Sequence, residues 1–383
     1  AGLNFGFSLL WALALSVIAT IVLQEMSARL GLVSNKGLSE VITQEITNPF
    51  FRNIVIALIL SAIVIGNAAY EAGNISGGVL GLEAVFGEKF FLIGDLKINL
   101  YSIILGLIAF YLLYKGNYKI IERSLILLVI IMSLSFIITA VITKPNLQDL
   151  FKGLFIPNFP DGSILIIVGL IGTTVVPYNL FLHASLVKER WNNKSDLKYA
   201  TNDTIVSVIL GGFVSMCIII SSASLNIDTI NNASDLAKGI EPLYGTYSKY
   251  ILAIGLFSAG ITSAITAPLA ASYVAAGCLG WSSNMKGKKF RLVWIFILLI
   301  GVISSSLGYK SIDIIKFAQV ANGILLPVIA AFLIWIVNKD SILGKYRNSK
   351  SQNIIGFTIL AITIFLGLKS ILKWGTKSYD AKE

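Results

Sequence analysis

The chain has 383 residues, of which 56% are hydrophobic and 13% charged, with a net charge of +10 and a mean hydropathy of +0.81. Soluble domains usually carry about 25% charged residues, so this composition excludes an ordinary soluble protein and favours one that lies in a membrane. The basic residues are spread through short loops, which argues against binding to nucleic acid. We expect a single transmembrane domain over residues 1–383, because no polar stretch is long enough to fold separately.

Apolar runs that approach the length needed to cross a bilayer recur along the whole chain. A membrane-spanning helix needs roughly 20 such residues, and this criterion predicts an all-α bundle of ten spans. The expected spans are residues 8–26, 53–72, 99–114, 120–143, 164–187, 205–224, 248–278, 291–307, 313–337 and 353–373.

The loops between these spans alternate in their content of Lys and Arg. One alternate set holds eighteen of these residues and the opposite set holds eight, which predicts that the first set is cytoplasmic. Residue 1 then lies on the outer side, with no signal peptide at its start. This placement predicts either insertion with the N-terminus outside or a further helix upstream, and the second is favoured for a reason given below.

The fifth span, 164–187, contains the polar stretch GTTVVPYNLFLHAS. Pro177 has no N–H, so the carbonyl of Thr173 loses its helical partner, and Gly172 eases local unwinding. Broken backbone at membrane depth is tolerated where it faces protein or a water-filled cavity. Discontinuous helices of this kind place carbonyls around cations in secondary transporters. The stretch therefore predicts a substrate site, and a simple proline kink is the alternative.

His183, the only histidine of the chain, lies four residues after Asn179 and shares its helix face. It could relay a proton, because histidine titrates near neutral pH. It could equally be a neutral imidazole that hydrogen-bonds a neighbouring helix.

Two other spans carry polar groups that bear on function. Glu71 stands near the expected outer end of span 53–72, where it reaches the interface or lines an outer vestibule. In span 313–337, Gln319 could bond a neighbouring helix or supply an oxygen to a cation, and Pro327 should break the helix. No residue set resembles the catalytic groups of an enzyme. Cys217 and Cys278 are expected to be buried free thiols.

Several of these segments are similar to one family of membrane proteins. They are GFSLLWALALSVIATIVLQEMSARLGLVSNKGLSEVI at 6–42, GTTVVPYNLFLHASLV at 172–187, and two weaker matches, the small-residue pattern of 255–273 and AQVANGILLP at 318–327. The chain resembles the NRAMP family of divalent metal transporters in their order and spacing, from residue 1 to the last span.

This resemblance implies a LeuT-type inverted repeat of five plus five helices, with a metal site between its broken first and sixth helices. The start of the chain resembles the second helix of the family. The family motif Asp-Pro-Gly-Asn, which supplies two metal ligands, does not occur in the 383 residues. We therefore expect that the first helix of the repeat is absent from the covered chain.

Some residues depart from the pattern that the resemblance implies. The family has a methionine at the position of Val176, and a histidine at that of Tyr178, whereas Asn179 matches. A thioether favours transition metals, and valine supplies no ligand atom. The implied site then consists of the Thr173 carbonyl, Gln319, water and the ligands that the missing helix supplies. Such a set of oxygens suits Mg²⁺ or Ca²⁺ better and leaves Mn²⁺ possible.

The acidic pair of the family's third helix is also changed. Its positions hold Asn67 and Tyr70, and Glu71 is displaced by one residue. One residue is about 100° of helix rotation, so Glu71 should not substitute for the acid in the family's proton path.

The leading hypothesis is a secondary transporter of Mg²⁺ or Mn²⁺, with alternating access around 172–179 and absent or unusual proton coupling. We expect a multi-pass monomer in a bacterial plasma membrane, with the metal as cargo and with no cofactor. One alternative is a transporter of a small organic solute on the same fold. The other is a receptor-like protein that does not transport.

Overall fold

The long helices lie close to the expected spans. The computed structural model describes residues 1–93, 96–116, 119–191, 193–225, 233–307 and 309–380. Within these ranges, nine helical segments are long and apolar enough to cross a membrane, and Leu100–Lys115 is a shorter apolar helix. The long helices are α2 (Leu10–Ser34), α4 (Pro49–Phe86), α5 (Leu100–Lys115), α6 (Lys119–Ile142), α8 (Ile164–Thr174), α9 (Pro177–Arg190), α10 (Leu197–Ala223), α13 (Ser248–Leu279), α14 (Lys288–Ser306), α15 (Ser311–Val337) and α17 (Lys350–Asp380).

Short elements connect these helices. They are the helices α1 (Gly2–Phe5), α3 (Leu38–Glu45), α7 (Leu147–Phe155), α11 (Ala233–Ala237), α12 (Glu241–Tyr244) and α16 (Asp340–Leu343), and an antiparallel hairpin of β1 (Phe90–Ile93) and β2 (Leu96–Asn99). The hairpin, in which Phe90 pairs with Asn99, was not expected from the sequence.

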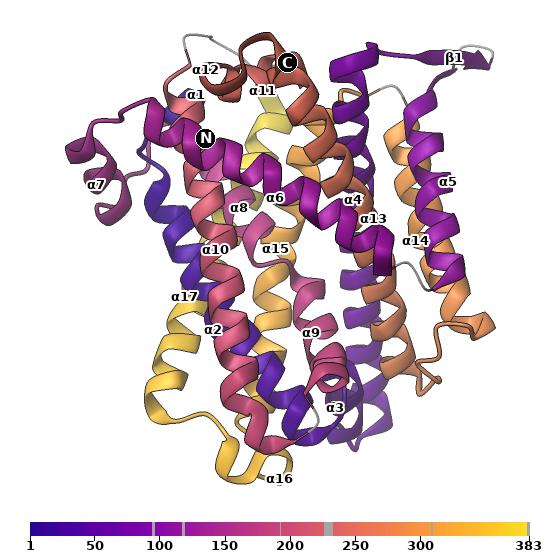
Figure 1. Ribbon diagram of the computed structural model, residues 1–383. Helices are drawn as coiled ribbons and strands as arrows, with labels where there is room; N and C mark the ends of the chain where they lie inside the picture. The colour runs from indigo at the N-terminus through magenta and orange to yellow at the C-terminus, as the bar shows by residue number, and fades with distance from the viewer. Residues whose placement is uncertain (94–95, 117–118, 192, 226–232, 308, 381–383) are drawn as a thin grey trace.

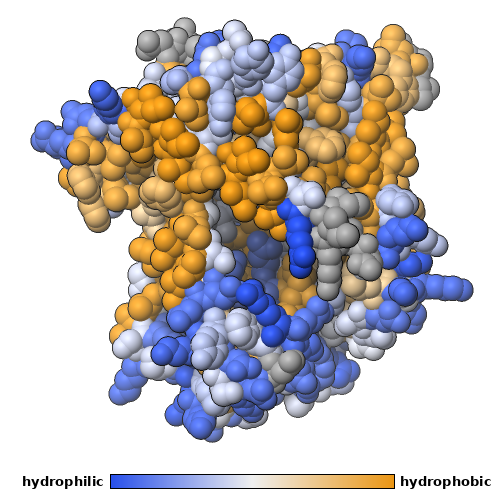
Figure 2. Space-filling view, viewed as in Figure 1, coloured by the Kyte–Doolittle hydropathy of each residue, from blue (hydrophilic) through white to orange (hydrophobic). Residues whose placement is uncertain are grey.

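Most of the long helices run along one common direction, while α6 crosses the bundle obliquely (Figure 1). The N-terminus lies in the upper half of this view, and α3 and α16 lie at the lower end. Figure 2 shows a broad hydrophobic surface over the upper part of the molecule and a hydrophilic surface at the lower end. The lower end therefore corresponds to the side that the basic loops predict to be cytoplasmic.

Small residues let α4 and α13 approach each other closely at the centre of the bundle. A Cβ atom added to Gly260 would lie 2.6 Å from the Cα atom of Gly78, and one added to Gly81 would lie 2.5 Å from the carbonyl oxygen of Ala253. Lipid tails are as apolar as the side chains of the helices, so the hydrophobic effect does not drive membrane helices together. Their association relies instead on close contacts of this kind.

Helix α2 is fixed to its neighbours by polar contacts near its C-terminal end. The Arg29 guanidinium, only 4% exposed, lies 3.0 Å from the carboxylate of Glu25. It also donates to the carbonyl of Tyr346 at 2.7 Å and to Asn348 Oδ1 at 2.7 Å. A buried charge is stable only when it is paired and hydrogen-bonded, so this network ties α2 to the loop that precedes α17.

The expected end of the second span at residue 72 was wrong, because α4 continues to Phe86. Residues 73–86 contain Gly and Asn, which weaken the helix signal in the sequence. In the structure, Gly73, Gly78 and Gly81 instead lie against neighbouring helices. This longer helix moves Glu71 from a helix end into the interior of the bundle.

Candidate functional site

The segment 164–187 is two helices with a two-residue break between them. Helix α8 ends at Thr174, Val175 and Val176 are non-helical with ψ angles of 77° and 122°, and α9 starts at Pro177. Proline at the first position of a helix needs no hydrogen bond from its missing N–H. Because residue 177 is proline, the Thr173 carbonyl has no N–H donor four residues further along the chain.

Gly172 was expected to help break the helix, and this was wrong. It lies within α8, where it makes a close contact with α15. A Cβ atom at Gly172 would lie 2.1 Å from the Gln319 carbonyl oxygen and 2.5 Å from the Gly323 nitrogen. A Cβ atom at Gly323 would lie 2.6 Å from the carbonyl oxygen of Val168. The glycines therefore hold the backbones of α8 and α15 together one turn from the break.

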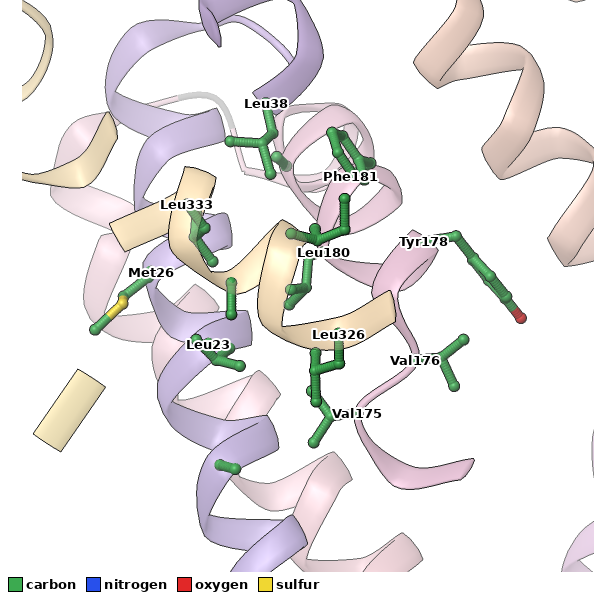
Figure 3. Packing of buried hydrophobic residues seen from close by; sticks show 14 of the residues in the cluster. Leu23, Met26, Leu38, Val175, Val176, Tyr178, Leu180, Phe181, Leu326 and Leu333 are labelled. Carbon is green, nitrogen blue, oxygen red and sulfur yellow. The ribbon is translucent and has the colours of Figure 1, made fainter. Parts of the chain in front are cut away.

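The two valines of the break point to different sides. Figure 3 shows Val175 directed toward Leu326 of α15, whereas Val176 and Tyr178 extend together on the side away from α15. Val175 is 1% exposed and Val176 is 4% exposed, so both lie inside the protein. Of the two, Val176 therefore shares the space beside the Tyr178 ring.

Hydroxyl groups gather on the Val176 side of the break. The Tyr178 ring packs edge-on against the Tyr70 ring of α4, with centroids 5.5 Å apart. The Tyr70 side chain also approaches the side chain of Thr173. Helices α4, α8 and α9 therefore converge at the break, with the oxygens of Thr173 beside two aromatic rings.

Asn67 and Glu71 both lie on α4, and their side chains contact two different neighbouring helices. The Asn67 amide donates to the Ala267 carbonyl of α13 at 2.9 Å, so it connects two helices. The Glu71 carboxylate is fully buried, and its Oε2 accepts a hydrogen bond from Asn74 at 3.2 Å. A Cβ atom on Gly301 would lie 2.3 Å from Glu71 Cγ, which places this side chain against α14.

The expectation that Glu71 reaches the interface or a vestibule was therefore wrong. Its Oε1 has no hydrogen-bond partner among the described residues, and no ion pair to this carboxylate is found there either. An ionised carboxylate in such a place costs far more than a neutral one. Among the described residues, Glu71 is therefore a buried carboxyl group without a counter-ion.

His183 is half-buried and bonds a neighbouring helix. Its Nε2 lies 3.1 Å from the hydroxyl oxygen of Thr204 on α10. The Thr204 hydroxyl also donates to the Ala200 carbonyl at 2.9 Å. Asn179, one turn before His183, is half-buried, and its backbone N–H donates to the Val176 carbonyl at 3.0 Å. The contact of His183 with Thr204 is the interhelical hydrogen bond that was one of the two alternatives for this histidine.

The polar residues of α15 lie next to α8. Gln319 is half-buried, and its Oε1 would lie 4.0 Å from a Cβ atom added to Gly169. Asn322 is 1% exposed, and its Nδ2 has no hydrogen-bond partner among the described residues. The expected break at Pro327 was wrong, because α15 is continuous from Ser311 to Val337.

Other contacts at the break carried no clear signal in the sequence. Val175 looked like an ordinary apolar residue, although it forms half of the break. The Ser27 hydroxyl of α2 donates to the carbonyl of Leu180 in the first turn of α9. Small polar residues in a span are the only sequence signal for such bonds, and they do not identify the partner.

The described residues contain no group of three or more His, Cys, Asp or Glu side chains that could hold a metal ion. The oxygens that the described residues offer beside the break, those of Thr173, Asn179 and Gln319, are neutral. Carbonyl, hydroxyl and water oxygens suit hard divalent cations better than soft transition metals.

Residues 1–373 match the family model described as Nramp, natural resistance-associated macrophage protein-like. The chain belongs to the Nramp family. It is 27% identical over 385 residues to a natural resistance-associated macrophage protein 2 homolog of Dictyostelium discoideum, and the match covers 97% of this chain and 59% of that relative. It is 26% identical to the divalent metal cation transporter MntH of Bradyrhizobium diazoefficiens, with 96% of this chain and 83% of the relative covered.

The fold is also that of solved Nramp structures. The chain superposes on the manganese transporter of Eremococcus coleocola with a TM-score of 0.73 and 17% identity, covering 97% of this chain and 81% of that one. A mutant of the same transporter gives a TM-score of 0.74. These matches confirm the all-α, LeuT-type bundle that was expected from the sequence, and they identify the protein as an integral, multi-pass membrane protein.

Proposed function

We propose that this protein transports divalent metal cations, Mg²⁺ or Mn²⁺, across the plasma membrane as a monomer, by alternating access around residues 172–179. Membership of the Nramp family and the relatives that are named divalent metal cation transporters support this class of substrate. The metal is the cargo, and the proposal requires no cofactor and no enzymatic step. Residues 1–383 act in it as one transmembrane unit.

The proposal depends on the oxygen atoms that lie beside the break. The Thr173 carbonyl at the end of α8 lacks a helical donor, and Val176 beside it supplies no thioether. Gln319 and Asn179 lie half-buried on the helices next to the break and would add amide oxygens. Because every such ligand is an oxygen, the site should favour Mg²⁺ or Mn²⁺ over softer metals.

We further propose that transport is not coupled to protons in the way that the resemblance implies. Asn67, at one position of the acidic pair, does not titrate and is used to bind α13. Tyr70, at the other, lies near Thr173 and packs on Tyr178. Glu71 is one residue away from the position of the acid and packs against Gly301 of α14, which argues against a simple replacement of that acid.

A small organic solute is the second candidate for the substrate. The pair of Tyr70 and Tyr178 with Val176 forms an aromatic and apolar wall beside the break. Such walls, with a few polar groups, are typical of sites for small molecules. Uptake of a solute in the absence of any divalent flux would favour this candidate.

The proposal is tested by uptake of Mg²⁺, Mn²⁺ and Ca²⁺ into proteoliposomes, with the internal pH recorded at the same time. We expect uptake of Mg²⁺ or Mn²⁺ without a matching acidification. The variant Glu71→Gln should leave the metal flux unchanged, because glutamine keeps the size of the side chain that packs against α14. No divalent flux at millimolar concentration would contradict the proposed substrate. A metal-driven proton flux that Glu71→Gln abolishes would contradict the proposal on coupling.

A further inference from the structure

Five basic side chains lie where the end of α5 meets the start of α14. We call them the basic cluster: Lys115, Lys286, Lys288, Lys289 and Arg291. Residues 100–115 and 279–306, which contain the cluster, include no Asp or Glu. None of the five cations forms an ion pair with another described residue. The cluster is therefore a local excess of positive charge without an internal counter-ion.

Aromatic rings contact three of these cations, and the Lys115 ammonium lies 5.7 Å from the centroid of the Tyr111 ring. The Arg291 guanidinium lies 4.3 Å from the centroid of the Tyr114 ring and donates to the Tyr114 carbonyl at 3.3 Å. The Lys289 ammonium lies 5.1 Å from the centroid of the Trp281 ring. Arg291 Nε is enclosed and has no hydrogen-bond partner in the described chain. Arg291 thus joins the two helices through the ring and the carbonyl of Tyr114.

The first turn of α14 adds backbone donors at the same place. The helix starts at Lys288, and its cap residue is Gly287, which provides no side-chain hydrogen bond. The first N–H groups of a helix lack internal partners and carry a partial positive charge, so they attract anions. The basic cluster and the start of α14 therefore offer charge and directed donors to a phosphate group.

The surface next to the cluster is apolar. On α5, Leu107 and Phe110 are exposed, and on α14, Leu292, Phe296 and Leu299 are exposed. Both helices lie at one edge of the bundle (Figure 1), where Figure 2 shows hydrophilic residues directly below a hydrophobic band. A ligand that fits both parts needs an anionic head and long apolar chains.

We propose that the basic cluster and the exposed faces of α5 and α14 bind an anionic phospholipid of the cytoplasmic leaflet. Its phosphate lies on Lys286, Lys288, Lys289 and Arg291, and its acyl chains lie along the two helices. Basic pockets at the cytoplasmic ends of membrane helices recognise anionic headgroups in this way. A soluble phosphate compound would satisfy the cations but would leave the apolar faces without a partner. The lipid also steadies α14, the helix that packs on Glu71.

Native mass spectrometry of the detergent-purified protein tests this site, with titration of phosphatidylglycerol, phosphatidylcholine and free glycerol phosphate. The test variant is Lys286→Gln/Lys288→Gln/Lys289→Gln, in which all three side chains are exposed. The matched control is Lys194→Gln/Lys198→Gln/Lys350→Gln, which removes the same charge from other exposed positions of the cytoplasmic side.

Of the three ligands, we expect only phosphatidylglycerol to bind tightly. Each lysine removed should weaken that binding about fivefold, or roughly a hundredfold for the test variant, whereas the control variant should bind as the unmodified protein does. Equal loss in both variants would show a general effect of charge and would overturn the proposal. Unchanged binding in the test variant, or glycerol phosphate that binds as tightly as the lipid, would also overturn it.

Discussion

Replacing Gly172 by alanine should abolish metal uptake and destabilise the protein by about 1–3 kcal/mol, the usual range for overpacking a filled interior. The new Cβ atom would lie 2.1 Å from the Gln319 carbonyl oxygen and 2.5 Å from the Gly323 nitrogen, both of which are backbone atoms. Since backbone atoms cannot relieve the clash by a change of rotamer, as a side chain can, α8 must move away from α15. That movement displaces the Thr173 carbonyl, one residue along the same helix.

Gly169→Ala is the matched control, because Gly169 lies one turn earlier on α8. Its added Cβ atom would meet only side-chain atoms of Val320 and Gln319, at 3.8 to 4.0 Å, which are ordinary contacts. Thermal unfolding in detergent and uptake into proteoliposomes measure both variants. Equal behaviour of the two variants would show that the contact between α8 and α15 does not position the break.

Val176→Met should shift selectivity toward transition metals, raising the apparent affinity for Mn²⁺ or Cd²⁺ relative to Mg²⁺ by about tenfold, or roughly 1.4 kcal/mol. The reason is that a thioether is a soft ligand, and residue 176 points to the same side of the break as Tyr178 (Figure 3). Competition between Mg²⁺ and Cd²⁺ during uptake measures this ratio.

Val175→Met controls for the added volume of the longer side chain. Val175 is equally buried but is directed toward Leu326 of α15, so its thioether should not reach a cation on the other side. This variant should lower stability without changing the ratio of metals. A ratio that shifts equally in both variants, or in neither, would mean that residue 176 does not line the site.

The class of fold could be predicted from the sequence because each membrane helix has a long apolar run. The basic loops also predict which side of the membrane is cytoplasmic. The ends of helices were less predictable where small residues occur. Residues 73–86 carry several glycines, which lower helix propensity, but in the structure these glycines pack closely against neighbouring helices.

The break in the fifth span was predictable because proline removes a specific hydrogen bond. The same argument failed at Pro327, where α15 continues without interruption. Proline alone therefore does not decide between a kink and a break. At residues 175–177, α8 is fixed to α15 on one side, and α2 bonds the start of α9 on the other. Those contacts come from distant parts of the chain, so no local pattern reveals them.

The orientation of side chains on α4 was predictable only in part. The displacement of Glu71 by one residue correctly implied a different helix face from Tyr70. The predicted position of Glu71 near the outer end of the helix was wrong, because it depended on the predicted end of that helix. A helix end is set by tertiary contacts as much as by local sequence, which explains why a buried carboxylate was taken for one near the interface.

Diffraction from crystals of the protein soaked in Mn²⁺ tests most directly whether the break holds the metal. We expect the main anomalous peak beside the Thr173 carbonyl oxygen, on the side of the break that Val176 and Tyr178 face. Soaking with excess Mg²⁺ should reduce this peak, because both cations would use the same oxygens. A main peak beside the Glu71 carboxylate, or no peak near residues 173–179 under conditions that support Mn²⁺ uptake, would contradict the proposed site.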